Sequence, residues 1–85
     1  MKTITIYLTD QLGKELKLNG KAAAINTAAI ERLIKKERNA INRWLLFGEA
    51  QFCVTDDATG EVVAEGHYSY NAFSGQGNYE LYEHR

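Results

Sequence analysis

Two alternating runs on either side of residues 56–60 constrain the fold more than any other feature of this sequence. In the first run Ala50, Phe52 and Val54 alternate with polar residues, and residues 61–68 continue the alternation after the turn. Such a period of two is typical of strands that bury one face. The two runs therefore predict a β-hairpin that turns at residues 56–60.

The register of this hairpin follows from a three-residue loop, residues 58–60, with Gly60 in the left-handed conformation. The loop pairs Asp57 with Glu61, Val54 with Ala64, Phe52 with Gly66 and Ala50 with Tyr68. One face is then apolar, and the other carries Gln51, Cys53, Thr55, Val63, Glu65 and His67. A slip by one residue would mix the two faces, so the hydrophobic pattern favours this register. The ring of Phe52 would cover the bare backbone of Gly66.

The N-terminal part predicts another hairpin. Residues 3–8 and 14–18 both alternate, and residues 10–13 supply the turn between them. Asn19 and Gly20 form a dipeptide typical of type I′ turns, which would reverse the chain again. Residues 21–25 then form either a short strand or, because of their three consecutive alanines, part of a helix.

Residues 27–47 show the three- and four-residue spacing of an amphipathic helix. Its apolar stripe consists of Ile30, Leu33, Ile34, Ile41, Trp44 and Leu45. Asn26 or Thr27 can cap the start by accepting a backbone N–H. Glu37 and Arg38 interrupt the stripe, which leaves room for a kink or a short break.

The tail adds a loop over residues 71–78 and a short edge strand over residues 79–82. The predicted fold is α+β in the order ββαββ(β), with one long amphipathic helix packed on a single antiparallel sheet of four to five strands. A lone sheet needs such a cover to bury its apolar face. We expect residues 1–85 to form a single domain.

The composition excludes several classes of protein. With 85 residues, 45% hydrophobic and 25% charged, the chain is neither collagenous nor disordered. Its single Cys53 cannot form an intrachain disulfide, and no apolar run reaches the roughly 18–20 residues of a membrane helix. The N-terminus lacks a signal-peptide core. We therefore expect a cytoplasmic protein with no membrane contact.

Charge is divided along the chain. Residues 1–48 hold nine Lys or Arg and four Asp or Glu, a net charge of +5. Residues 49–85 hold one Arg and seven Asp or Glu, a net charge of −6. This asymmetry bears on the partners that the chain would attract.

Catalytic and metal sites are not indicated. The predicted register places His67 on the same face as Cys53 but diagonal to it, and no third residue orients the imidazole as nucleophilic catalysis requires. His67, His84 and Cys53 lack the spacing of zinc ligands. We therefore expect no enzyme, no metal and no cofactor.

The acidic and tyrosine-rich C-terminal half is the favoured candidate site. It contains Asp56, Asp57, Glu61, Glu65, Tyr68, Tyr70, Phe73, Tyr79 and Tyr82. Tyrosine is enriched in protein interfaces, and carboxylates around it favour a basic partner surface. The hypothesis is a non-enzymatic protein-binding module that occludes a basic surface of a larger protein or ribonucleoprotein complex. Alternatively, Tyr68 and one or two other rings complete the core.

The basic helix gives the competing hypothesis of a small nucleic-acid-binding protein. Its cations are Arg32, Lys35, Lys36, Arg38 and Arg43. Five cations on one helix can neutralise phosphates. An isoelectric point of about 6.1 favours instead a solvated outer face with pairs such as Glu31–Lys35. A third hypothesis is a homodimer closed through an exposed sheet edge.

In the order of its elements the chain resembles small phage-borne or mobile-element inhibitors, the anti-CRISPR-like proteins among them. The elements that carry the resemblance are the strand at residues 1–8, the helix at residues 26–47 and the hairpin at residues 52–68. The resemblance implies an inhibitor of a bacterial defence complex, acting in the cytoplasm of the host cell. It also implies that the acidic face of residues 56–65 blocks a basic nucleic-acid groove.

Overall fold

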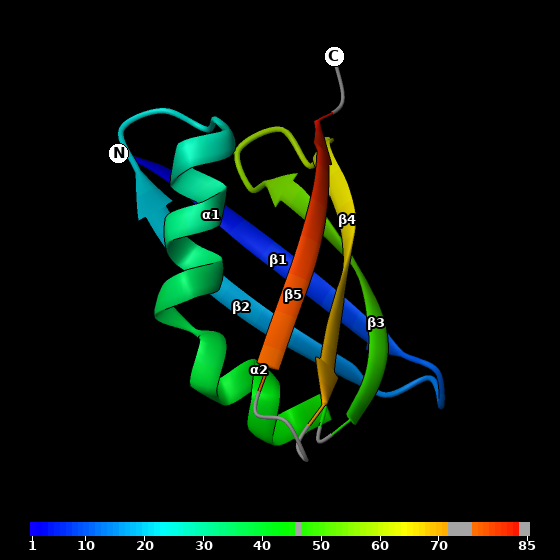
Figure 1. The fold of residues 1–85 in the computed structure, drawn as a ribbon. Helices are drawn as coiled ribbons and strands as arrows, with labels where there is room; N and C mark the ends of the chain where they lie inside the picture. Colours follow the sequence, from blue (N-terminus) through cyan, green and yellow to red (C-terminus); the bar gives the residue numbers. More distant parts are fainter. Residues whose placement is uncertain (46, 72–75, 84–85) are drawn as a thin grey trace.

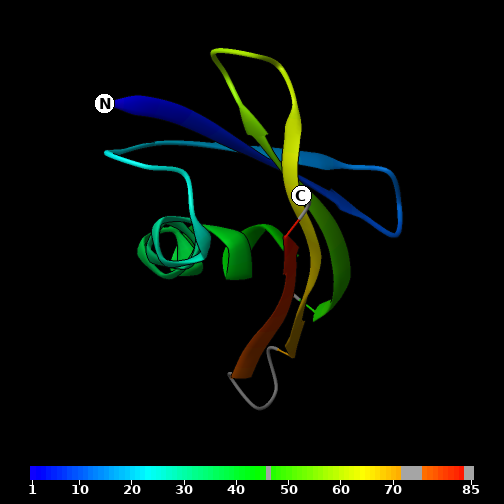
Figure 2. The same ribbon diagram turned by 90° about the horizontal axis from the view of Figure 1, so that it is seen from above.

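The computed structural model describes residues 1–45, 47–71 and 76–83. The elements are β1 (Lys2–Asp10), β2 (Glu15–Ala22), α1 (Thr27–Lys36), α2 (Arg38–Leu45), β3 (Phe47–Asp56), β4 (Val62–Asn71) and β5 (Gln76–Glu83). All neighbouring strands are antiparallel, and the strands form one sheet in the order β2-β1-β3-β4-β5. The sheet curves around the two helices, which lie on one of its faces (Figures 1 and 2).

The single long helix predicted over residues 27–47 is wrong, because the chain forms two short helices that break at Glu37. The Glu37 N–H still donates to the carbonyl of Leu33 at 3.0 Å, but a φ of −96° and a ψ of 11° end α1 there. A straight rod cannot follow a curved sheet. The break turns α2 back toward the sheet, so that Ile41 and Leu45 are buried as well.

The turn predicted at Asn19 and Gly20 is also wrong, because β2 runs straight through these residues to Ala22. Gly20 lies opposite Ile4 of β1. A Cβ atom at Gly20 would lie only 2.8 Å from Cδ2 of Leu33. A side chain at residue 20 would therefore displace the Leu33 side chain of α1, and this long-range packing overrides the local preference for a turn.

The register predicted for the second hairpin is confirmed along most of its length. Phe52 lies opposite Gly66, and Gly60 has a φ of +74° as expected. The tip differs, because a bulge places Thr55 opposite Val62. Asp57 does not pair with Glu61. Its N–H instead donates to the carbonyl of Thr3 in β1 at 3.1 Å, which extends the contact between β1 and the end of β3.

The last strand is longer than predicted. β5 begins at Gln76 and pairs with β4 as far as Ala64 opposite Glu83. The expected loop over residues 71–78 is therefore shorter, since Asn71 belongs to β4 and residues 76–78 belong to β5.

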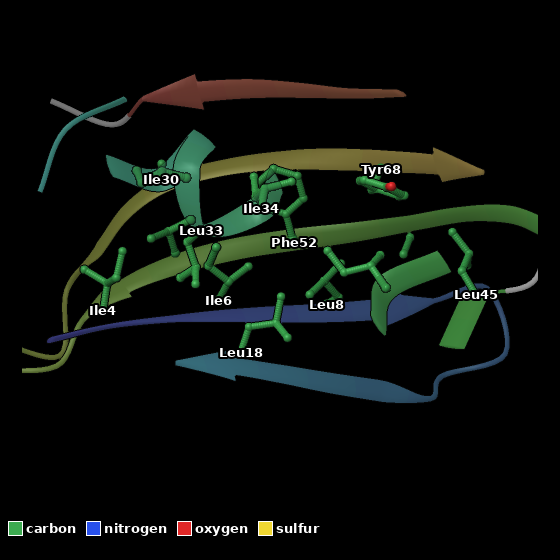
Figure 3. Close-up of a cluster of buried hydrophobic side chains, with 14 residues drawn as sticks. Ile4, Ile6, Leu8, Leu18, Ile30, Leu33, Ile34, Leu45, Phe52 and Tyr68 are labelled. Carbon is green, nitrogen blue, oxygen red and sulfur yellow. The ribbon is translucent and has the colours of Figure 1, made fainter. Parts of the chain in front are cut away.

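The core lies between the helices and the inner face of the sheet (Figure 3). Its members are Ile4, Ile6, Leu8, Leu18, Ile30, Leu33, Ile34, Ile41, Leu45, Ala50, Phe52, Val54, Ala64 and Tyr68. The apolar positions of the predicted strands and of the helical stripe thus meet in one cluster, with Trp44 packed half-buried against it. Asn26 caps α1, since its Oδ1 accepts the Ala29 N–H at 2.9 Å.

Candidate binding face of the sheet

The outer face of the sheet, which the helices leave uncovered, brings polar side chains of all five strands together. The strand registers align two rows across it. One row is Lys17, Tyr7, Cys53, Glu65 and Tyr82, and the other is Glu15, Thr9, Gln51, His67 and Glu80. These residues alternate with the core positions of the same strands, which is why they face away from the helices.

A hollow of about 990 Å³ lies on this outer face. Its carboxylates are Asp10, Glu15, Glu49 and Glu65, and no Lys or Arg of the described residues lines it. Asp10 is partly compensated by Lys14 at 3.8 Å and accepts the N–H groups of Leu12 and Lys14, so it also holds the first turn. The hollow is therefore acidic.

Two exposed tyrosines lie among these carboxylates. Tyr7 is 38% exposed, and Nζ of Lys17 lies 5.8 Å from the centre of its ring. Tyr82 is 56% exposed and donates its hydroxyl hydrogen to the carboxylate of Glu80. This hydrogen bond and the charge of Glu80 raise the pKa of Tyr82. Both rings lie at the surface, where a partner can contact them.

The thiol and the imidazole in the hollow lie as the sequence predicted. His67 is opposite Gln51, and Cys53 is opposite Glu65, so the two groups are diagonal neighbours. Burial, and then the charge of Glu65, raise the pKa of the Cys53 thiol. A raised pKa disfavours the thiolate, which is the nucleophilic form. The described residues also contain no cluster of three or more His, Cys, Asp or Glu suited to a metal ion.

The structure separates the predicted tyrosines. Tyr68 is 1% exposed, and its hydroxyl donates to Oδ1 of Asn42 at 2.6 Å. Tyr79 is half-buried and stacks on Tyr68, with ring centres 6.4 Å apart. Tyr70 is also half-buried against the core. Tyr68, Tyr70 and Tyr79 therefore belong to the helix side of the sheet, Tyr82 belongs to the outer face, and Phe73 lies outside the described residues.

The predicted carboxylates also occupy two places. Asp56, Asp57 and Glu61 lie at the turn between β3 and β4, whereas Glu65 lies in the hollow. Asp57 accepts the hydroxyl hydrogen of the buried Thr5, with O···O distances of 2.7 and 2.9 Å. Asp56 accepts the N–H of Ala58 at 3.0 Å and so stabilises the turn.

Tyr7, Glu15 and Glu49 are candidate binding residues that were not predicted from the sequence. The signal that would have found Tyr7 and Glu15 is the alternation of β1 and β2, which sends both side chains away from the core. The division of charge along the chain hid this, since both residues lie in its basic half. They reach the acidic hollow because β1 pairs with β3.

The basic residues predicted to bind nucleic acid belong to α1 and α2, which lie on the opposite side of the sheet from its outer face (Figure 2). The exposed ones include Arg32, Lys35, Lys36 and Arg43. Arg38 is also exposed, but its Nη2 donates to the carbonyl of Gly77 at 2.8 Å and links the start of α2 to β5.

No helix in the described part of the chain is long and apolar enough to cross a membrane. No protein-family model matches the chain, and neither a curated protein nor a solved structure matches it significantly.

Proposed function

We propose that the protein is a non-enzymatic binding module that docks the outer face of its sheet on a basic surface of a partner protein. The observation that carries the proposal is the hollow, which has four carboxylates and no Lys or Arg among its described lining residues. Tyr7 and Tyr82 supply exposed aromatic area beside this charge. Aromatic residues are enriched in interfaces, and complementary charge accelerates the encounter with a partner.

The proposed binding surface differs from the surface predicted from the sequence. Tyr82 and Glu65 of the predicted set belong to the outer face, and Tyr7, Glu15 and Glu49 join them. Tyr68 supports the fold rather than the surface, because it is buried in the core. Inhibition of a bacterial defence complex rests on the resemblance in element order alone and stays a prediction.

Glu49→Lys tests the proposal, with Glu61→Lys as the matched control. Both residues are exposed, and both changes add two positive charges, but Glu61 lies at the turn outside the hollow. Binding of a labelled octalysine peptide is measured by fluorescence polarisation at low salt. We expect Glu49→Lys to weaken binding about thirtyfold, since the reversal replaces an attraction of roughly 1 kcal/mol at contact by a repulsion of about the same size, a change of about 2 kcal/mol. Equal effects of the two variants would remove the hollow from the proposal.

The competing function is nucleic-acid binding by α1, which exposes Arg32, Lys35 and Lys36 on one helix. It is tested with a labelled DNA duplex and the double variant Lys35→Glu, Lys36→Glu. Tight binding of the duplex that falls steeply with salt and is lost in this variant would favour the helix over the sheet.

A further inference from the structure

The two edges of the sheet differ in their protection against further pairing. The β2 edge carries exposed Lys17 and Lys21, and exposed lysines on an edge discourage another strand from pairing with it. The β5 edge, Gln76–Glu83, contains no Lys, Arg or Pro. β5 is therefore the edge that is open to pairing.

The hydrogen bonds around β5 identify the backbone groups that point outward. The carbonyl of Gly77 accepts from Arg38 and so points away from β4. The carbonyl of Glu80 points toward β4, since a Cβ atom at Gly66 would lie 2.0 Å from it. Residues of an antiparallel strand alternate between these two directions. The N–H and C=O groups of Tyr79 and Leu81 therefore point outward, where a further strand would bind them.

Charge decides what kind of strand fits this edge. A second copy paired antiparallel about Glu80 would use the outward groups of Tyr79 and Leu81 and would place Glu80 opposite Glu80 of that copy. Like charges directly opposite each other destabilise a strand pair. A strand with a Lys or Arg opposite Glu80 turns this repulsion into an attraction. On the helix side of the sheet, apolar residues of the added strand would contact the half-buried side chains of Tyr79 and Leu81.

We propose that the outer edge of β5 binds an extended segment of a partner protein in which a Lys or Arg lies between two apolar residues. The segment adds a sixth strand next to β5, and its positive charge lies beside Glu80 and Tyr82 on the outer face. Arg38 limits the pairing at the Gly77 end. This inference rests on the basic partner of the proposed function and assigns the backbone edge that holds it.

The test uses an acetylated and amidated eight-residue peptide in which valines alternate with threonines and one central lysine replaces a threonine. A matched peptide carries glutamate in place of the lysine. Hydrogen–deuterium exchange of the full chain is followed by NMR. We expect the lysine peptide to slow exchange of the Tyr79 and Leu81 amides at least tenfold, and to leave the β2 edge unchanged. We also expect it to bind at least fivefold more tightly than the glutamate peptide.

Glu80→Lys provides the decisive variant, because it should reverse the preference between the two peptides while leaving the backbone edge intact. Equal affinity of both peptides for this variant, or unchanged exchange at Tyr79 and Leu81, would overturn the inference. If octalysine still binds the hollow, the proposed function survives that result. A mass that doubles with concentration in light scattering, with the same two amides protected, would assign the edge to a second copy and also overturn the inference.

Discussion

Gly66 is the most crowded glycine of the second hairpin, and its replacement by alanine tests the packing of the sheet. A Cβ atom there would lie 2.0 Å from the carbonyl oxygen of Glu80 and 2.6 Å from Cζ of Phe52. Real Cβ atoms approach other atoms no closer than 3.0 Å, so the carbonyl would have to retreat by about 1 Å. Since this carbonyl belongs to the backbone of β5, the pairing of β4 with β5 must be disturbed.

The size of the effect follows from two opposing contributions. Overpacking of a well-ordered core costs about 1–3 kcal/mol, and the upper end applies because backbone and a ring that is 4% exposed are the obstacles. Alanine restricts the unfolded chain more than glycine does, which returns about 0.4–1 kcal/mol. We therefore expect Gly66→Ala to lower the free energy of unfolding by about 2 kcal/mol. With a shift of roughly 4–8 °C per kcal/mol, the Tm falls by about 8–16 °C.

Urea unfolding followed by circular dichroism measures this loss, with Gly60→Ala as the control. Gly60 has a φ of +74° and nothing within 4 Å of its Cβ position, so the control reports only the cost of the left-handed backbone, about 1–2 kcal/mol. The double variant Phe52→Leu, Gly66→Ala separates the ring from the carbonyl. Leucine lacks Cζ, so Gly66→Ala should cost less in the Phe52→Leu background, measured against Phe52→Leu alone, than it does in the original chain. A loss below 0.5 kcal/mol for Gly66→Ala, or an equal cost in the two backgrounds, would refute the packing argument.

Two further predictions concern buried groups. Tyr68→Phe removes the hydroxyl that donates to Asn42 and should lower the free energy of unfolding, measured in urea, by about 1 kcal/mol. Asn42→Ala should cause the same loss, and the double variant should lose no more than either single variant if this hydrogen bond is responsible. The raised pKa of Cys53 predicts that iodoacetamide alkylates the folded protein at pH 8 more slowly than a short unfolded cysteine peptide. Because the Glu65 charge is one of the causes, Glu65→Gln should lower the pKa of the thiol and speed the reaction, and an unchanged rate would argue against that charge.

The hairpins could be predicted from the sequence because their information is local. Side chains alternate between the two faces of a strand and only one face is apolar, so a register shifted by one residue is excluded. The observed pairing of Phe52 with Gly66 agrees with this. The sequence indicates where the helix can break, because Glu37 and Arg38 interrupt the apolar stripe, but it does not decide whether the helix breaks there. Ile34 and Ile41 fit one continuous apolar stripe as well as two helices, and the curvature of the sheet, which decides between them, depends on strands far away in the sequence.

The candidate site was predictable only in part, for the same reason. The charge difference between the halves of the chain is a one-dimensional property, and it assigned Glu15 to the basic half. The pairing of β1 with β3 brings Glu15 to the hollow beside Glu49. The predicted register places Tyr68 on the same apolar face as Ala50 and Phe52, so the burial of its ring could be expected from its position in the strand. The tyrosine content of the C-terminal half predicts Tyr68 as a binding residue only because composition takes no account of which face a side chain occupies.

The place of β1 inside the sheet has a consequence for how the chain folds. Each hairpin can form from neighbouring segments, but the pairing of β1 with β3 joins residues 40 to 52 positions apart. Closing such a loop costs chain entropy before any contact compensates for it, and contacts of this range slow folding. Until that closure, the first hairpin exposes the inner edge of β1, with Ile4, Ile6 and Leu8 uncovered. At high concentration, strands of other unfolded chains would therefore compete with β3 of the same chain for the edge of β1. The rate of loop closure would then determine the yield of folded protein.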